Sequence, residues 1–171
     1  PTDVAGTYFY WGAVAHAGRR LTRGPGGQLV GAYLVDLAPP PPGERVMVMT
    51  TWMATEPIVG VDTPFVMGIN GRTWPSTERL TYGVGDTVRW RVLSASGADH
   101  PMHLHGTYFR VDARGGRQRD TSYAADARRW VVTENLPPMS SMAVTWVPPR
   151  PGRWLFHCHR ALHMSAAQKD Y

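Results

Sequence analysis

Hydrophobic and polar residues alternate in short runs along this chain. The runs are rich in Val, Thr and aromatic residues, and Gly, Pro and Asn-Gly pairs separate them. Side chains alternate between the faces of a strand with a period of two, so runs of this kind predict an all-β fold, a Greek-key sandwich. The clearest predicted strands cover residues 6–11, 29–37, 45–53, 87–93, 130–134 and 142–147.

The length of the chain predicts one nearly complete domain preceded by an incomplete one. A chain of 171 residues can hold one full domain and part of another, with ample capacity for a packed core. The region 54–64 is rich in turn-forming residues and has little periodicity, so we place the boundary there. Residues 1–60 would form the partial domain, and residues 61–171 the domain that carries the candidate site.

Composition argues against two classes of partner. The net charge of +5 comes almost entirely from Arg, with Lys169 as the sole lysine. The arginines are scattered, whereas nucleic-acid binding needs a basic face, and the most basic stretch, 114–129, predicts an exposed loop. No run approaches the ~20 apolar residues of a membrane span, and the N-terminus shows no signal-peptide pattern. We therefore expect no nucleic-acid partner and no membrane span.

Six of the seven histidines and the only cysteine lie in two short clusters. These read His100-Pro-Met-His103-Leu-His105-Gly106 and His157-Cys158-His159-Arg-Ala-Leu-His163. A single Cys cannot form an intrachain disulfide, and a thiolate among several imidazoles is typical of a copper or zinc ligand set. The seventh histidine, His16, lies in a predicted loop, where an exposed or satisfied side chain is expected.

The segment around Cys158 predicts a strand whose two faces carry different chemistry. Trp154, Phe156 and Cys158 would share the inner face. His157 and His159 would lie on the outer face. Cys158 would then face an aromatic interior and could not share one metal with its immediate neighbours, so two sites, one on each side of the strand, are predicted.

The first cluster divides in the same way. His103 and His105 are two residues apart and would project from one face of a strand. That strand is predicted to continue through residues 106–111. Pro101 would interrupt strand pairing and let His100 turn elsewhere. One histidine of this cluster would then serve the thiolate site, with His163 as its third ligand. Two His and one Cys with a weak axial ligand are typical of a blue-copper electron-transfer centre, whereas zinc on the same ligands would do no redox chemistry.

The two clusters resemble the motifs of the C-terminal domain of the multicopper oxidases, the laccase-like enzymes. That family's motifs read H-P-x-H-L-H-G and H-C-H-x-x-x-H, and both are complete here. The resemblance is specific from Phe65 to His163 and weaker in the first sixty residues. It implies the cupredoxin form of the sandwich and an exported protein, periplasmic or secreted.

The resemblance also implies how copper would be held. His100, Cys158 and His163 would bind the type 1 copper, His103 the type 2 copper, and His105, His157 and His159 the paired type 3 coppers. In that family a reducing substrate, a phenol, an aromatic amine or a metal ion, gives electrons to the type 1 copper. Cys158, His157 and His159 would then relay the electrons to the three-copper cluster, where dioxygen becomes water.

Part of the family's ligand set is missing from this chain. The three-copper cluster takes two further His-x-His pairs from the first domain, and neither is present; the place where one pair would begin is Trp11. The axial residue, ten positions after the Cys, would be Gln168, with Met164 or a residue outside this chain as alternatives. We expect a missing N-terminal segment of the same protein, a homo-oligomer or a complementary chain to complete the cluster.

The expected function is that of a copper-dependent, laccase-like oxidoreductase, acting as part of a larger chain or assembly. The alternative is a blue-copper electron-transfer or copper-binding module without oxidase activity. A copper nitrite reductase-like protein fits less well, because four histidines beyond the thiolate site exceed what one shared type 2 copper needs. The methionines, such as Met47 and Met49, are expected to pack in the core instead of forming an auxiliary copper patch.

Overall fold

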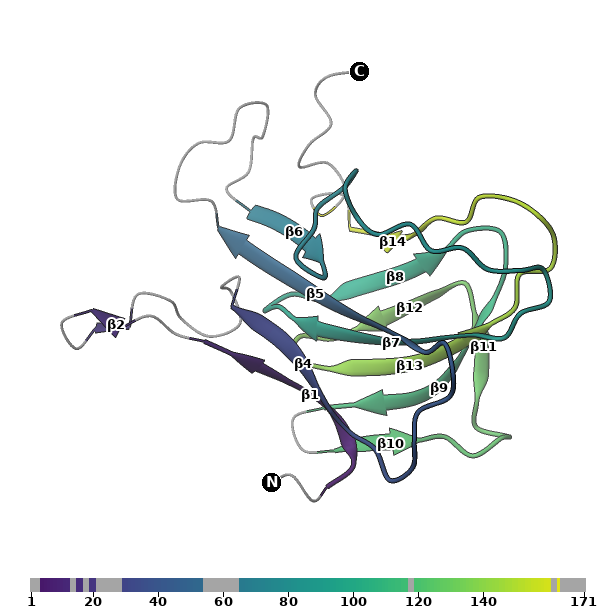
Figure 1. Cartoon of the computed structure of the whole chain (residues 1–171), viewed down its shortest axis with the longest axis horizontal. Coiled ribbons are helices and arrows are strands. Elements are labelled where there is room, and N and C mark those ends of the chain that lie inside the picture. Colours follow the sequence, from purple (N-terminus) through teal and green to yellow (C-terminus); the bar gives the residue numbers. More distant parts are fainter. Residues whose placement is uncertain are drawn as a thin grey trace.

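The computed structural model describes residues 4–12, 15–16, 19–20, 29–53, 65–116, 119–160 and 163, and β-strands make up nearly all of their regular structure. The all-β prediction is confirmed. The strands are β1 (Gly6–Trp11), β2 (Ala15–His16), β3 (Arg19–Arg20), β4 (Val30–Val35), β5 (Arg45–Met53), β6 (Phe65–Ile69), β7 (Val88–Ala95), β8 (His100–Leu104), β9 (Phe109–Gly115), β10 (Asp120–Ser122), β11 (Arg129–Val131), β12 (Thr133–Leu136), β13 (Ser141–Trp146) and β14 (Phe156–Cys158) (Figure 1).

Two sheets enclose the main core. The larger sheet has the strand order β10-β9-β13-β7-β5-β6, with β11 paired to the edge of β9. The smaller sheet has the order β12-β8-β14, and all its pairings are antiparallel. Buried side chains from both sheets, such as Trp90, Val144, Met102 and Leu136, form one apolar cluster. The core therefore lies between the sheets and fixes β8 and β14, which carry both histidine clusters, to the rest of the molecule.

The hairpin of β1 and β4 adds a second, smaller core. Val48 and Leu93 are buried there against Phe9 and Ala32. The hydroxyl of Thr7 also donates a hydrogen bond to Asp120 Oδ2 at 2.7 Å, which ties β1 to β10. The hairpin thus packs on strands of the larger sheet.

The predicted domain boundary, 54–64, lies outside the described residues. On either side of it, β5 and β6 pair antiparallel in the same sheet. β5 also pairs in parallel with β7. β5 therefore shares a sheet with the C-terminal strands, and the division into 1–60 and 61–171 stays a prediction.

The structure corrects two expectations around the first histidine cluster. Pro101 does not interrupt strand pairing, because its carbonyl accepts the His159 N–H at 2.7 Å and it lies opposite Asn135. The predicted continuous strand after His105 is also wrong, because the chain turns at Gly106 with a φ of 75°. A Cβ at that position would lie 2.5 Å from Cζ3 of Trp154, so the turn requires glycine.

Two further predicted segments differ from the structure. Residues 130–134 do not form one strand: β11 ends at Val131 in the larger sheet, and β12 begins at Thr133 in the smaller one. The predicted loop 114–129 contains the end of β9 and all of β10. Met47 and Met49 are buried in the core, as expected.

Candidate metal centres

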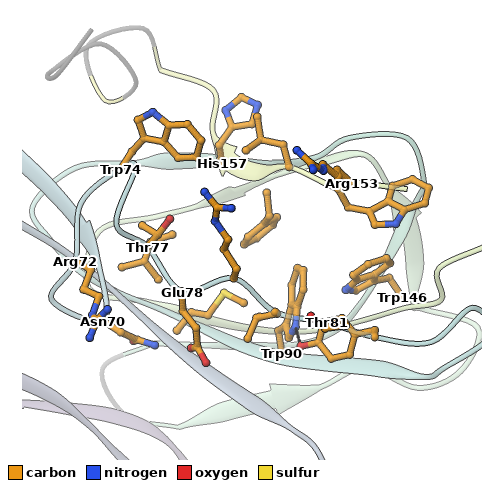
Figure 2. Close-up of a pocket in the computed structure, with 18 of the residues that line it drawn as sticks. Asn70, Arg72, Trp74, Thr77, Glu78, Thr81, Trp90, Trp146, Arg153 and His157 are labelled. Atoms are coloured by element: carbon orange, nitrogen blue, oxygen red, sulfur yellow. Dashed lines mark hydrogen bonds between the residues drawn. The ribbon is translucent and has the colours of Figure 1, made fainter. Parts of the chain in front are cut away.

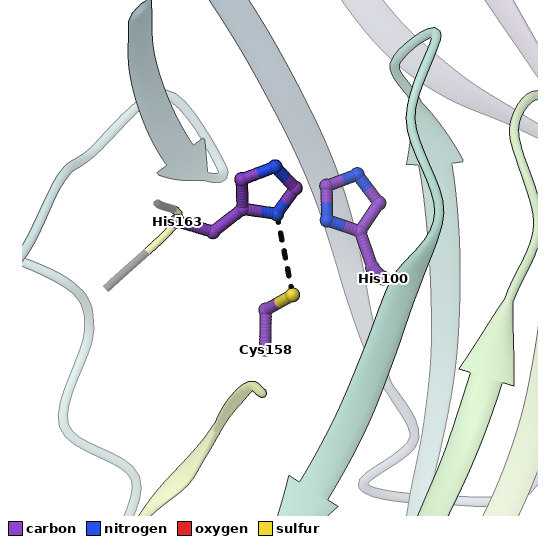
Figure 3. A group of neighbouring side chains, drawn as sticks. All are labelled: His100, Cys158 and His163. Carbon is purple, nitrogen blue, oxygen red and sulfur yellow. Dashed lines mark hydrogen bonds between the residues drawn. The ribbon is translucent and has the colours of Figure 1, made fainter. Parts of the chain in front are cut away.

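The thiolate site combines residues from two strands and the segment that follows them. His100 begins β8, Cys158 ends β14, and His163 lies five residues further on. Their ligand atoms all lie within 4.8 Å of one another, and the three side chains point toward a common centre (Figure 3). Cys158 Sγ is 3.3 Å from His163 Nδ1, and the two imidazole centroids are 5.0 Å apart. The three residues that sequence patterns assigned to one site thus meet in space.

Burial controls the protonation of this site. Desolvation raises the pKa of the Cys158 thiol, opposed by the backbone N–H and the positive charge of Arg160. Desolvation lowers the pKa of His100 to about 4, and the charges of His163 and Arg160 act in the same direction. The pKa of His163 is lowered by desolvation and then by Arg160. At neutral pH the site therefore offers neutral imidazoles and a protonated thiol, which must lose its proton when a metal binds.

The donor set fits a copper or zinc ion. His100 is fully buried, and its Nδ1 has no hydrogen-bond partner among the described residues. Its other ring nitrogen, Nε2, lies 2.5 Å from Ser96 Oγ. A buried imidazole nitrogen without a partner is unfavourable unless it binds something, and a metal ion beside two other soft ligands would satisfy it.

The other four histidines gather on the opposite side of β14. His157 lies directly opposite His103 in the β14–β8 pairing. The centroid of the His103 ring is 4.9 Å from that of His105, 5.7 Å from that of His157 and 5.3 Å from that of His159. We call these four side chains the four-histidine face. The alternation predicted for β14 therefore holds, and the strand separates the two groups.

Hydrogen bonds orient two of these imidazoles. His103 Nδ1 lies 2.7 Å from the carbonyl oxygen of Val132 and 2.8 Å from Thr133 Oγ1. His157 Nδ1 lies 2.8 Å from the carbonyl oxygen of Cys158. Because carbonyl oxygens only accept, both rings carry their proton on Nδ1 and leave Nε2 free as a ligand. His157 Nε2 in turn lies 3.0 Å from His105 Nε2, close enough for both to bind one ion.

The four-histidine face is less complete as a metal site than the thiolate site. Within the described residues, no three of its imidazoles bring their ligand atoms within 4.8 Å of one another. His105 and His159 are exposed, while His103 and His157 are partly buried. The pKa of His157 is lowered by desolvation and by its three imidazole neighbours, although its bond to Cys158 opposes this. Further ligands would have room to approach from outside.

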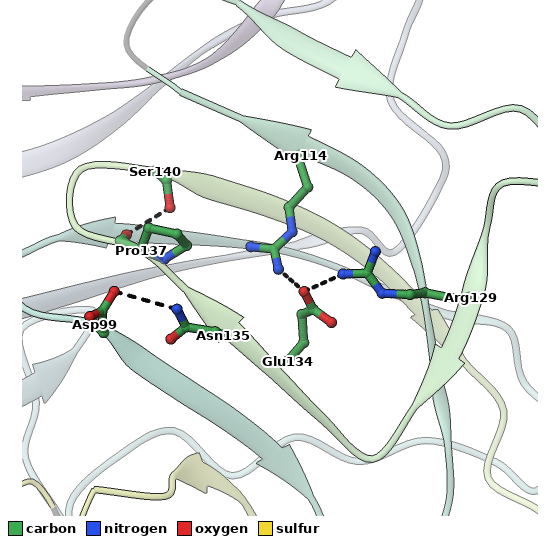
Figure 4. A network of polar contacts seen from close by, with 7 residues as sticks. All are labelled: Asp99, Arg114, Arg129, Glu134, Asn135, Pro137 and Ser140. Atoms are coloured by element: carbon green, nitrogen blue, oxygen red, sulfur yellow. Dashed lines mark hydrogen bonds and ion pairs between the residues drawn. The ribbon is translucent and has the colours of Figure 1, made fainter.

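A buried ion-pair network holds the strand that supports His103. Glu134 on β12 is almost fully buried and accepts hydrogen bonds from Arg114 and Arg129 (Figure 4). Asn135 on the same strand donates to Asp99 at 3.4 Å. Removing Arg114 or Arg129 would leave the buried charge of Glu134 less compensated. The network therefore fixes β12 against its neighbours. The predicted exposed loop therefore contains two arginines with a structural role, of which Arg114 is partly buried and Arg129 is exposed.

An apolar cavity of about 960 Å³ opens beside the thiolate site. Trp90 and Trp146 line its floor, and its wall reaches Cys158, His157 and His163 (Figure 2). Cys158 itself is 8% exposed, and this burial accounts for the desolvation that raises the thiol pKa.

Several site expectations lie beyond the described residues. The axial candidates Gln168 and Met164 are outside them, as is the side chain of His16. Sequence patterns missed Ser96, Val132 and Thr133, which contact the histidines but carry no motif of their own. Ser96 has Ser94 and Gly97 close by, and Thr133 is followed by Glu134 and Asn135, so neither residue stands out from its neighbours in the sequence.

The fold is of the cupredoxin class, and the three ligands of the thiolate site suit a copper or zinc ion. The family model described as multicopper oxidase matches residues 38–168, so the chain belongs to the multicopper oxidase family, and copper is the cofactor this implies.

Relatives of known name support this membership. Laccase-5 of Trametes villosa is 36% identical over 94 residues, which cover 55% of this chain and 18% of the laccase. The iron transport multicopper oxidase fio1 of Schizosaccharomyces pombe is 30% identical over 100 residues, covering 54% of this chain and 16% of that protein. The chain thus spans less than a fifth of the length of these relatives.

Solved structures show the same fold. The multicopper oxidase mgLAC aligns with a TM-score of 0.66 and 25% identity, over 81% of this chain and 46% of that one. The blue copper oxidase of Nitrosomonas europaea aligns with a TM-score of 0.67 and 22% identity, over 82% and 46%. Within the described residues, no helix is both long and apolar enough to cross a bilayer.

Proposed function

We propose that this chain is the copper-binding part of a laccase-like oxidoreductase. Electrons from a reducing substrate would enter at the thiolate site, as type 1 copper chemistry, and reach a dioxygen-reducing cluster on the four-histidine face. His103 would hold the type 2 copper, and His105, His157 and His159 the type 3 coppers. Gln168 or Met164 would supply the axial ligand of the type 1 copper.

One observation carries this proposal: Cys158 belongs to the thiolate site while both of its neighbours in sequence belong to the four-histidine face. A single peptide unit separates the sulfur-bearing residue from His157 on one side and from His159 on the other. The bond between His157 Nδ1–H and the Cys158 carbonyl, at 2.8 Å, adds a second contact between the groups. A continuous bonded path thus joins the two candidate sites.

The chain's own residues prepare both sites for the metal. Copper bound to them would supply one-electron redox chemistry at the thiolate site and dioxygen reduction at the four-histidine face. Burial keeps His100 and His163 neutral, so their lone pairs are free at neutral pH. The Val132 carbonyl holds the proton of His103 on Nδ1, and the Cys158 carbonyl does the same for His157, so both Nε2 atoms keep a lone pair for a metal.

The remaining cluster ligands would come from a surface that docks on the four-histidine face. Exposed apolar side chains lie near these histidines in the sequence: Tyr108 and Trp130 are 60% and 55% exposed, and Leu155, whose carbonyl accepts the His105 N–H, is 45% exposed. Thr107, Tyr108, Trp130 and Val147 line a shallow hollow. A concentration of exposed aromatic residues is typical of an interaction surface. We propose that a homo-oligomer or a complementary chain supplies the missing histidines.

The named relatives suggest the substrate and the compartment. Laccase-5 and fio1, the latter an iron transport oxidase by name, support a phenol, an aromatic amine or a metal ion as the reductant and dioxygen as the acceptor. We propose a periplasmic or secreted location on the same resemblance.

Copper loading of the Cys158→Ser variant tests the thiolate site. The oxidised wild-type protein should show an intense blue thiolate-to-copper absorption, because the sulfur is the donor of that transition. Cys158→Ser should lose the absorption while its far-ultraviolet circular dichroism is unchanged. His105→Ala is the matched control, since that imidazole lies on the opposite face, and it should stay blue. Colour that persists in Cys158→Ser would disprove the assignment.

A second candidate is an electron-transfer module without oxygen chemistry. It is favoured by the four-histidine face, where no three described imidazoles converge as closely as the thiolate ligands do. The copper content of the purified protein separates the two functions. One copper per chain supports the module, and several per chain support a completed cluster.

A further inference from the structure

Ser96 contacts the Nε2 atom of the His100 ring, while the Nδ1 atom has no hydrogen-bond partner among the described residues. Both residues are fully buried, and Ser96 Oγ is 2.5 Å from His100 Nε2. Ser96 follows the end of β7, four residues before His100, and its chain neighbours turn back toward β8. A contact this short between buried groups fixes the position of the imidazole ring.

The hydrogen bonds around Ser96 select one tautomer of His100. Its hydroxyl oxygen accepts the Ala98 N–H at 3.2 Å, and its own proton can reach the Ala98 carbonyl at 3.3 Å. When the Ser96 hydroxyl donates its hydrogen bond to the Ala98 carbonyl, it can only accept a hydrogen bond from His100. The ring proton of His100 then lies on Nε2. His100 Nδ1 is then a bare lone pair, which agrees with its lack of any partner among the described residues.

The opposite arrangement leaves buried groups unsatisfied. If Ser96 donated to His100 Nε2, the ring proton would sit on Nδ1, where no described residue accepts it. The Ala98 carbonyl would also lose the Ser96 hydroxyl as a partner. Buried donors without acceptors are strongly disfavoured, so the first arrangement prevails.

We propose that Ser96 is a positioning residue of the thiolate site, which holds His100 in the Nε2–H tautomer and turns its Nδ1 lone pair toward Cys158 and His163. The tautomer is a property of the metal-free chain. Its consequence for metal binding rests on the proposed function, because it requires that the thiolate site hold copper. Residues behind a metal ligand tune affinity in this way by fixing the ring before the ion arrives.

Nitrogen-15 NMR of the histidine rings in the metal-free protein tests the tautomer directly. The His100 ring should show a protonated Nε2 and an unprotonated Nδ1, two environments with well-separated resonances. In Ser96→Ala the ring should populate both tautomers, because Nε2 has lost its acceptor. Ser94→Ala is the matched control, because it removes the same hydroxyl group from an equally buried serine. Ser94 Oγ lies 3.4 Å from Ser96 Oγ. It should keep the wild-type spectrum.

Copper titration, followed by the thiolate absorption, tests the consequence. Ser96→Ala should bind copper roughly 10- to 100-fold more weakly than wild type, and Ser94→Ala with unchanged affinity. A wild-type His100 that carries its proton on Nδ1 would overturn the proposal without any variant, as would an unchanged tautomer in Ser96→Ala. Equal losses of affinity in the two variants would show a general packing effect instead. A protein that never becomes blue would refute the copper function and leave the tautomer result standing.

Discussion

Histidines of one short motif have different environments in this molecule. His100 is fully buried, whereas His105, five residues later, is exposed. The contrast follows from strand alternation in β8 and from the turn that ends it. Burial makes His100 a neutral ligand at nearly every physiological pH, since desolvation lowers its pKa to about 4. Position relative to the core, more than residue type, therefore decides what each imidazole can do.

The lowered pKa of His100 predicts that the metal-free protein loses stability in mild acid. Between pH 6.5, the ordinary pKa of histidine, and pH 4, about the pKa of His100 in the folded chain, His100 is protonated in the unfolded chain and neutral in the folded chain. The free energy of unfolding therefore falls as pH drops through this window, by about 3 kcal/mol from this residue, and its contribution levels off below pH 4. Urea unfolding at pH 7, 5.5 and 4 measures the slope.

His100→Gln is the control for this prediction, because it removes the titrating group and keeps a polar side chain. Its unfolding free energy should decline less steeply over the same window. Equal slopes for wild type and variant would assign the acid sensitivity to other groups, such as His157 and His163, whose pKa values burial also lowers.

The ligand residues could be predicted from the sequence, but the groups that orient them could not. Cys158 and its flanking histidines have a motif and a strand phase, which are local properties. The Val132 carbonyl reaches His103 from 29 positions away, and backbone carbonyls carry no sequence signal. Ser96 is closer in sequence, yet only the fold of the turn before β8 shows that its hydroxyl meets the ring.

At the scale of elements, alternation predicted strands well and turns poorly. The predicted run 45–53 coincides with β5, because eight of its nine residues are Val, Met, Thr or Trp and the strand lies inside one sheet. The predicted strand through His105 failed, because the signal for its end is a single glycine. Gly106 is needed for two reasons: its φ is positive, and the Trp154 ring lies too close for a Cβ. Several other glycines of the chain share the positive φ, but not the contact with Trp154.

Alanine substitution separates these two reasons. Gly106 and Gly71 both have a φ of 75°, but a Cβ at Gly71 would meet nothing within 4 Å. Gly71→Ala should therefore lower the free energy of unfolding by about 1 kcal/mol, from backbone strain alone. Gly106→Ala should lower it by roughly 1–3 kcal/mol more, because the methyl group displaces the Trp154 ring. Chemical denaturation of both variants measures the difference, and equal losses would mean that Trp154 moves aside freely.

At the scale of the whole molecule, the two candidate sites differ in how much of each this chain supplies. The thiolate site draws its three ligands from β8, β14 and His163, all within one sandwich. In the four-histidine face, His105 and His159 are exposed, whereas His103 and His157 are partly buried. The family resemblance predicted both ligand sets. It could not predict a partner surface, because motifs in this sequence carry no information about residues outside it.

Oxygen consumption by the isolated 171-residue chain tests whether this chain supplies the whole thiolate site but only part of the dioxygen-reducing cluster. The chain should bind copper at the thiolate site and accept electrons from a small reductant under anaerobic conditions, because His100, Cys158 and His163 all belong to this chain. It should not reduce dioxygen at a steady rate, because the chain offers only four outward histidines and His16 as the one other. Adding a complementary segment that bears the missing His-x-His pairs should restore turnover. Steady oxygen consumption by the monomer, abolished in His157→Ala, would show that these four histidines suffice and that no partner surface is required.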